Sequence, residues 1–217
     1  MDPELLLSSL HMHESDESLA NSFGQHLRLA IGSVISLTLI TGCVFPLTLF
    51  AVGRLLYPDQ ASGSLVMRHG VVVGSRVIGQ NFIRPEYFHP RPSAAGAGYD
   101  GTSSGGTNFG PANPKLIDDV RKLAENYRLS NGLAPDTDVP IDAVTRSGSG
   151  LDPHISPQNA ALQIPRVARA RGVSEEIVRG LLAVHTQGPQ LGFLGNPRIS
   201  VLDLNLALDQ TVPIMIR

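Results

Sequence analysis

The stretch that decides the architecture is LAIGSVISLTLITGCVFPLTLFAVG, residues Leu29 to Gly53, which has no charged side chain and is bracketed by Arg28 and Arg54. A helix rises about 1.5 Å per residue, so about 20 apolar residues cross the roughly 30 Å core of a bilayer. A cleaved signal peptide is the main alternative, but its apolar region has about 7–15 residues and follows a basic start. Here the preceding segment is acidic, so the sequence predicts a membrane-spanning helix within residues 27–56.

Small residues, hydroxylic residues and one proline interrupt this apolar stretch. Small side chains let membrane helices approach closely, and a proline is tolerated where neighbours satisfy the freed carbonyl. The composition therefore favours packing against other membrane helices, and the plain alternative is a lipid-facing anchor of low hydrophobicity. The predicted packing residues are Gly32, Ser36, Gly42 and Pro46.

The flanking charges leave the orientation of the span open. Arg28 precedes it, whereas Arg54 and Arg68 follow it, which weakly favours a cytoplasmic C-terminal part. Long domains are translocated largely regardless of such charges.

The 217 residues allow this anchor and one ordinary domain. We expect an acidic, disordered tail at residues 1–26, the span at 27–56 and a soluble domain at 57–217. From Arg54 onward 16 Lys and Arg oppose 14 Asp and Glu, with no basic stripe, so nucleic acid is not a predicted partner. The single cysteine, Cys43, lies within the span, and the domain therefore has no disulfide and no thiolate ligand.

Local patterns predict an α+β domain with a small antiparallel sheet and several helices. Two β-prone runs around Gly70 predict a hairpin over residues 64–73, with a bulge at Gly74. Helix starts are predicted where a capping residue precedes a helical pattern, and Pro165 is expected to break or kink the second helix. The predicted N-terminal caps are Asn113, Ser156, Ser174 and Ser200.

Residues 84–114 are rich in glycine and proline, which excludes regular structure. Tyr87, Phe88, Tyr99 and Phe109 argue against disorder, because aromatic residues this frequent usually pack. Long loops inside compact domains are usually functional or disordered. We therefore expect an ordered, irregular loop that forms a surface.

Catalytic signals are weak, and no catalytic residue is predicted. No His-Glu-x-x-His or cysteine-based motif occurs among the Ser, Asp and His residues, which include His69, His89, His154 and His185. Asp152 and His154 could pair as an oriented base, which keeps a membrane-anchored hydrolase as the alternative function. His11 and His13 are too few for a tight metal site, so no metal site is predicted. The SSGGT segment at 103–107 could cradle phosphate through backbone amides, although a simple turn is the commoner explanation.

Four blocks in order along the chain carry a resemblance to a known family. They are Gly74-Ser75 with Ile78-Gly79-Gln80 and Phe82; Arg91-Pro92-Ser93 with Tyr99-Asp100, Ser104-Gly105-Gly106 and Asn113-Pro114; SGSGLDPHIS at 147–156 with QIPRVA at 163–168; and LDLNLALD at 202–209. With the span they resemble the KdpC family, the C subunits of bacterial potassium-transporting P-type ATPases. The long acidic tail and an apparent insertion at Ala97-Gly98 depart from the family pattern.

This resemblance implies a non-catalytic accessory subunit in the bacterial inner membrane, with its C-terminal domain outside. The implied partners are a potassium-channel-like subunit, an ATP-hydrolysing P-type subunit and a small stabilising peptide, besides membrane lipid. The family is also described as a catalytic chaperone that promotes ATP use, through a segment that here would be Ser104, Gly105 and Gly106. No cofactor is expected to bind tightly, and ATP would be met only through the partner subunit. A domain outside the membrane meets no cytosolic ATP, so we favour the scaffold interpretation.

Overall fold

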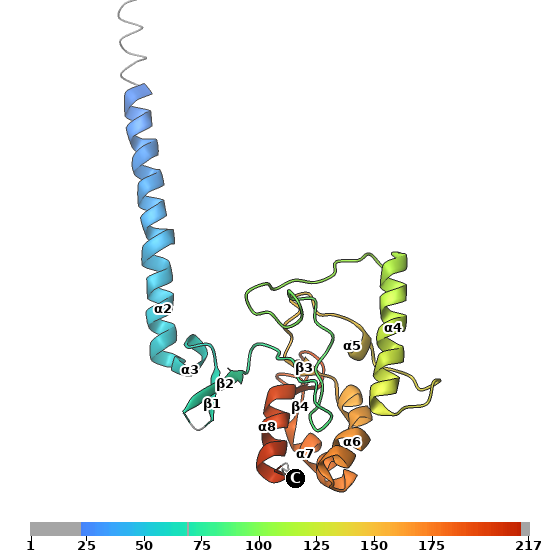
Figure 1. The fold of residues 1–217 in the computed structure, drawn as a ribbon. Coiled ribbons are helices and arrows are strands. Elements are labelled where there is room, and N and C mark those ends of the chain that lie inside the picture. The colour runs from blue at the N-terminus through green and yellow to red at the C-terminus, as the bar shows by residue number, and fades with distance from the viewer. Residues whose placement is uncertain (1–22, 69, 214–217) are drawn as a thin grey trace, which may run out of the picture. The chain divides into compact units, whose positions relative to one another are not determined.

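The computed structural model describes residues 23–68 and 70–213 (Figure 1). Its contacts divide the chain into two compact units, with the boundary between Ser62 and Gly63. His11 and His13, most of the predicted tail, and His69 lie outside the described residues. Residues 23–26, which the sequence placed in the tail, already belong to the first helix.

The first unit is dominated by a helix from Phe23 to Leu56, 34 residues long and apolar enough to cross a membrane. It consists of α-helix at residues 23–39, a π-helical turn η1 at Ile40–Val44 and α2 at Phe45–Leu56. In η1 the amide of Phe45 donates to the carbonyl of Ile40, five residues earlier. Pro46 follows directly, and a proline lacks an amide donor and clashes with the carbonyl four residues back. The wider turn accommodates this proline without breaking the helix.

The end of the long helix is fixed by its own side chains. Tyr57 leaves helical geometry and the short helix α3, Pro58–Ala61, follows. The Arg54 guanidinium donates to the Ser62 hydroxyl at 2.6 Å and lies over the Phe50 ring at 5.6 Å. The long helix therefore ends at Leu56.

The described part of the second unit contains two small antiparallel sheets. Strands β1, Leu65–Arg68, and β2, Val71–Ser75, form the predicted hairpin, with a register irregularity opposite Val66 and Met67. The other sheet has the order β3-β5-β4, from His154–Ile155, Arg198–Ser200 and Thr186–Gln187. The sequence did not predict this three-stranded sheet, because strands of two or three residues leave no periodic pattern.

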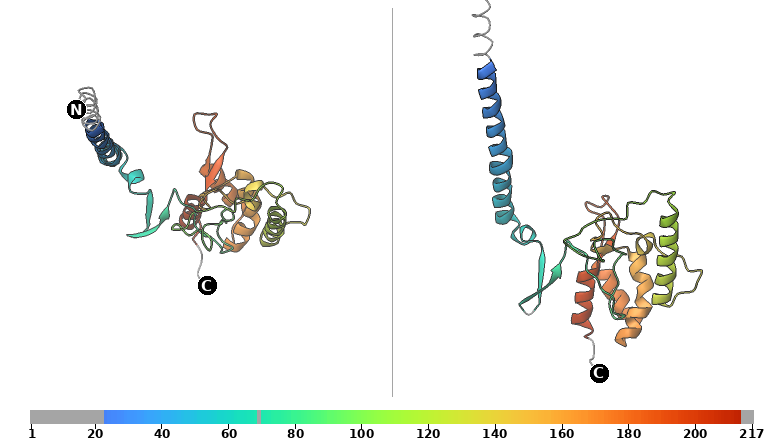
Figure 2. Two further views of the ribbon diagram at one scale, coloured as in Figure 1. Left: turned by 90° about the horizontal axis from the view of Figure 1, so that it is seen from above. Right: turned by 45° about the horizontal axis from the view of Figure 1, so that its top comes forward.

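Among residues 70–213 the second unit also has five helices: α4 Pro114–Asn131, α5 Ile141–Val144, α6 Pro157–Arg171, α7 Glu175–His185 and α8 Val201–Thr211 (Figures 1 and 2). Helices α6, α7 and α8 pack beside the three-stranded sheet. Their apolar faces form one core with Phe88 from the irregular loop. The α+β prediction is confirmed.

Three of the four predicted caps are observed. Asn113, Ser156 and Ser200 each accept a backbone amide at the start of α4, α6 and α8. Ser174 precedes α7, but its hydroxyl makes no capping bond to the helix backbone. Pro165 does not break α6, which runs unbroken to Arg171 because its packed face holds it in place.

Candidate functional site: an ordered loop and the network that holds it

The first part of the irregular loop, residues 84–89, is held against helices by side chains that bond its backbone. The amide and carbonyl of Phe88 bond the Asn205 side chain of α8, at 2.8 and 3.0 Å. The amide and carbonyl of His89 bond the Gln163 side chain of α6, at 2.7 and 3.1 Å. The side-chain amide of Asn205 or Gln163 thus bonds both the backbone N–H and the backbone carbonyl of one loop residue, as a neighbouring strand would. The segment is ordered without belonging to a sheet.

Arg166 of α6 is the centre of this arrangement. Its guanidinium donates to the carbonyls of Pro85 and Tyr87 at 2.7 and 2.9 Å, and to the side chains of Asn131 and Gln163 at 2.9 and 2.7 Å. The residue is only 8% exposed. Burial lowers the pKa of Arg166 to about 10, so it remains charged at neutral pH. Oxygen acceptors from three segments therefore replace its hydration.

Arg171, at the end of α6, extends the network to α8. It donates to the Glu86 carbonyl at 2.7 Å and pairs with Asp209 at 3.0 Å. Its guanidinium also lies over the Tyr87 ring at 5.1 Å, and the Tyr87 hydroxyl bonds Asp209. Two arginines of one helix thus hold residues 85–87.

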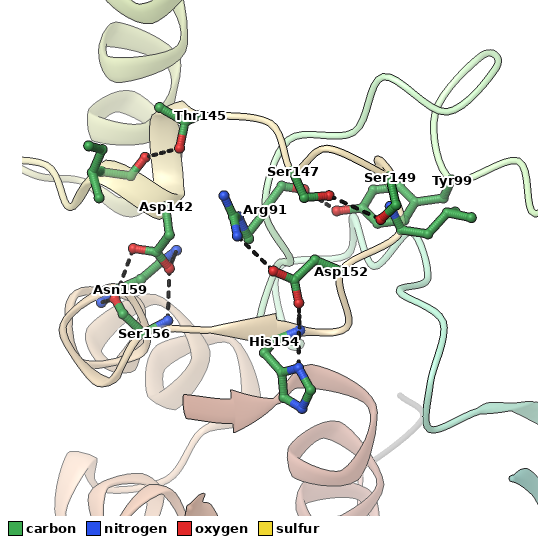
Figure 3. A network of polar contacts seen from close by, with 12 residues as sticks. Arg91, Tyr99, Asp142, Thr145, Ser147, Ser149, Asp152, His154, Ser156 and Asn159 are labelled. Atoms are coloured by element: carbon green, nitrogen blue, oxygen red, sulfur yellow. Dashed lines mark hydrogen bonds and ion pairs between the residues drawn. The ribbon is translucent and has the colours of Figure 1, made fainter. Parts of the chain in front are cut away.

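The second part of the loop, residues 91–107, lies against the SGSG segment at 147–150 (Figure 3). The Ser93 hydroxyl donates to the Gly150 carbonyl at 2.6 Å and accepts the amides of Ala95 and Tyr99. Gly150 has φ of +69°, and a Cβ there would lie 2.6 Å from the Ala95 amide nitrogen. Glycine is required at this position because two backbones meet there.

The predicted nucleotide-contact residues are part of the same packing. The Gly105 amide and the Ser104 hydroxyl both donate to the Ser149 carbonyl, at 2.9 and 3.0 Å. A Cβ on Gly106 would lie 3.1 Å from the Gly148 carbonyl oxygen. A phosphate cradle needs free amide donors. Two of the donors that such a cradle would use are already satisfied within the chain.

Arg91, Asp152 and His154 form the charged part of this region (Figure 3). Arg91 donates to Asp152 at 2.6 Å, and the His154 backbone amide donates at 3.0 Å. The imidazole Nδ1 of His154 lies 3.4 Å from Asp152. Burial alone would raise the pKa of Asp152, but the bonds from His154 and Arg91 outweigh it and lower the pKa to about 2. Asp152 is therefore an anion that joins the loop to the start of β3.

This depressed pKa predicts a pH-dependent contribution to stability. A carboxylate whose pKa is lower in the folded state stabilises that state. Its full contribution to the free energy of unfolding is present at pH values above the unfolded pKa of 3.8 and is lost as the pH falls towards 2. Asp152→Asn should lower the free energy of unfolding by about 2 kcal/mol at pH 6 and by almost nothing at pH 2. Urea titrations of both chains across this range measure the difference. Asp136→Asn, at an exposed position away from the network, is the control; a deficit independent of pH would contradict the assignment.

The Asp152–His154 pair does not form a hydrolase site. The hydroxyls of the neighbouring serines bond other groups than His154. Ser156 donates to Asp142 at 2.8 Å, and Ser149 accepts the Leu151 amide. Across residues 23–68 and 70–213, no serine or threonine hydroxyl bonds the His154 ring. The same residues contain no group of three or more potential metal ligands. The pair orders a loop, and the hydrolase alternative is not supported.

The predicted packing residues of the span fall on two faces. Gly32 and Ser36 are one helical turn apart and share a face. The π turn adds one residue, which rotates the following side chains by about 100° relative to a continuous α-helix. Gly42 and Pro46 therefore do not continue the Gly32–Ser36 face. The hydroxyls of Thr41 and Thr48 donate to carbonyls of their own helix, at 2.7 and 2.8 Å, so they are not free donors for a neighbour.

Sequence reasoning missed the residues that hold the loop. Arg166, Gln163 and Asn205 are polar residues on otherwise apolar helix faces, and each is buried. That position is the signal that could have revealed them, because buried polar groups are almost always bonded. Their partners in the loop lie 74 to 117 residues away in the chain, which no local pattern encodes.

An N-terminal helix long and apolar enough to cross a membrane, followed by a domain with an ordered irregular loop, is typical of a membrane-anchored protein. Comparison with known proteins gives the family. The model of the family "KdpC: K+-transporting ATPase, c chain" matches residues 27–210. The chain belongs to this family.

Individual relatives agree over most of their length. A potassium-transporting ATPase KdpC subunit from Beijerinckia indica is 51% identical over 88% of this chain and 96% of its own. The protein of that name from Mycobacterium tuberculosis H37Rv is 52% identical over 83% and 96%. The one from Caulobacter vibrioides is 51% identical over 87% and 94%.

Proposed function

We propose that this chain is the accessory subunit of a multi-subunit potassium-transporting ATPase, anchored in the bacterial inner membrane by its long helix. Family membership carries the proposal, since the model covers both the helix and the domain. The ordered loop supports it, because its polar residues are used to fix a surface rather than to build a reaction centre. The chain itself is non-catalytic in this proposal.

The proposed partners are a channel-like subunit, the ATP-hydrolysing subunit and a small stabilising peptide. The chain would promote ATP use by holding these subunits together, not by binding nucleotide. The internal bonds of Ser104 and Gly105 support this version, because a phosphate would have to displace them. We place the second unit outside the membrane, as the family resemblance implies.

The proposal predicts that the Gly32–Ser36 face of the helix contacts a partner helix. Gly32→Leu with Ser36→Leu fills this face and leaves a helix that still crosses the membrane. Co-purification of the other subunits should fall about tenfold, which corresponds to about 1.4 kcal/mol of lost packing. Val34→Leu with Thr38→Leu repeats the spacing on another face and is the matched control.

Affinity purification from detergent-solubilised membranes, together with potassium uptake in cells that depend on this pump, measures both variants. An intact complex and unchanged uptake with the Gly32/Ser36 variant would show that this face does not contact a partner helix. A wild-type chain that purifies without any ATPase subunit would refute the proposed function itself.

A further inference from the structure

The segment between β4 and β5 forms a projecting, apolar-tipped hairpin (residues 188–197, here the β4–β5 tip). In Figure 2, left, it extends away from the helices of its own unit. Leu191 and Phe193 at its end are 83% and 75% exposed, and Leu194 is about half exposed. Residues 186–197 contain no charged side chain. Water-facing loops are normally polar, so this composition indicates a surface that becomes buried.

The tip is a formed turn and not a loose loop. Gln190 and Leu194 exchange two backbone hydrogen bonds, each 2.9 Å, and the Phe193 amide donates to the Gln190 carbonyl at 3.2 Å. Leu191 has φ of +53° and Gly192 has φ of +83°. Hairpin turns of this kind favour Asn or Gly at both positions, because L side chains are strained at positive φ. A leucine held there, pointing into solvent, serves no packing purpose within this unit.

Such strain indicates a receptor with a fixed shape. A fluid lipid surface accepts an apolar side chain in many orientations and gains nothing from a strained turn. A protein pocket binds a side chain more tightly when the side chain is already held in its bound orientation. The absence of charge also matches the desolvated centre of a protein interface, where charged residues are depleted.

The exposed apolar area of the tip limits which protein can bind it. Leu191, Phe193 and Leu194 together expose on the order of 400 Å², whereas a stable interface buries about 800 Å² per partner. The tip alone cannot hold a second copy of this chain. It suffices for a protein already held nearby by another contact, since a tethered partner has a high effective concentration. Only residues 57–62 separate the membrane helix from the second unit, so such a partner is another protein of the same membrane complex.

We propose that the β4–β5 tip inserts Leu191 and Phe193 into an apolar pocket on a neighbouring subunit of the potassium-transporting complex. This inference rests on the proposed function and names one surface through which it is carried out. The membrane helix supplies the primary contact and the tip fixes the second unit on its neighbour.

Leu191→Asn with Phe193→Ser tests the tip without damaging the turn, because Asn adopts positive φ readily. The purified variant should unfold at the same urea concentration as the wild type, or higher. The fraction of complex that survives dilution in detergent should fall at least fivefold. Leu129→Gln removes a leucine of similar exposure from α4 and should leave the complex intact.

A photo-crosslinking benzoylphenylalanine in place of Phe193, in the full complex in membranes, identifies the occupant. An adduct with another ATPase subunit, identified by mass spectrometry, supports the proposal. An adduct with lipid or a second copy of this chain, or no adduct, overturns it. An unaltered complex in the double variant also overturns it, while leaving the proposed function standing if the wild-type chain still co-purifies with the other subunits.

Discussion

Replacing Arg166 by methionine should lower the free energy of unfolding of the second unit by about 3 to 5 kcal/mol. The substitution leaves the carbonyls of Pro85 and Tyr87 and the side-chain oxygen of Asn131 without their donor. The side-chain oxygen of Gln163 loses its bond from Arg166 and keeps the one from the His89 amide. Each buried polar group without a partner costs about 1 to 3 kcal/mol. Since the charge stabilises residues 85–87 directly, the start of the loop should detach before the helices unfold.

Urea unfolding of the full chain in detergent, followed by near-ultraviolet circular dichroism, measures this effect, because three of the four tyrosines lie in the second unit. Arg169→Met, at an exposed position of the same helix, should change the stability by no more than about 0.5 kcal/mol. Arg166→Lys keeps the charge but loses the planar fork, and should be nearly as damaging as methionine. A midpoint for Arg166→Met equal to that of the wild type would show that the loop is held by other contacts.

Replacing Gly150 by alanine should destabilise the second unit by about 2 to 4 kcal/mol and separate residues 93–105 from the SGSG segment. The added methyl carbon would lie 2.6 Å from the Ala95 amide nitrogen and 2.7 Å from the Gly105 carbonyl oxygen. Both neighbours are backbone atoms, so they cannot move aside without moving the loop. The φ of +69° adds strain for any residue with a side chain.

Gly148, two residues earlier in the same segment, is the matched control. A methyl group there meets open space, so Gly148→Ala should unfold like the wild type. Limited proteolysis should cut the Gly150→Ala chain faster within residues 94–110, and potassium uptake should fall with it if the loop surface serves the complex. Equal losses in the two variants would contradict the packing explanation, because they differ in contacts and not in composition.

Local signals were sufficient for the elements that depend on neighbours in the sequence. The apolar run with Arg54 at its end predicted the span, and the residues Asn113, Ser156 and Ser200 predicted three helix starts. Each signal works because a helix satisfies its own backbone and needs only a cap and an apolar face. The alternating leucines of residues 202–208 could have been a strand, and the cap at Ser200 correctly indicated a helix.

The candidate site could be predicted only as an ordered loop. Its aromatic content indicated packing, and Phe88 is indeed fully buried. The bonds that order it, from Arg166, Gln163 and Asn205, could not be predicted, because a polar residue on a helix does not specify which distant carbonyl it will meet. The prediction of a nucleotide contact at Ser104–Gly106 has the same limit. The sequence of a glycine-rich loop does not show whether its backbone amides are free to bind phosphate or already bonded within the chain.

By itself the sequence determined that this protein carries one apolar helix of membrane-spanning length, a set of capped helices and the residue blocks of its family. The tertiary structure alone decided that Arg166 bonds residues 85–87, that Gly150 lies against Ala95, and that Leu191 stands strained at the end of a projecting turn. The reason is the range of the interactions. Helix length, caps and apolar faces follow from residues a few positions apart, whereas these contacts join segments brought together only when the core around Phe88 closes.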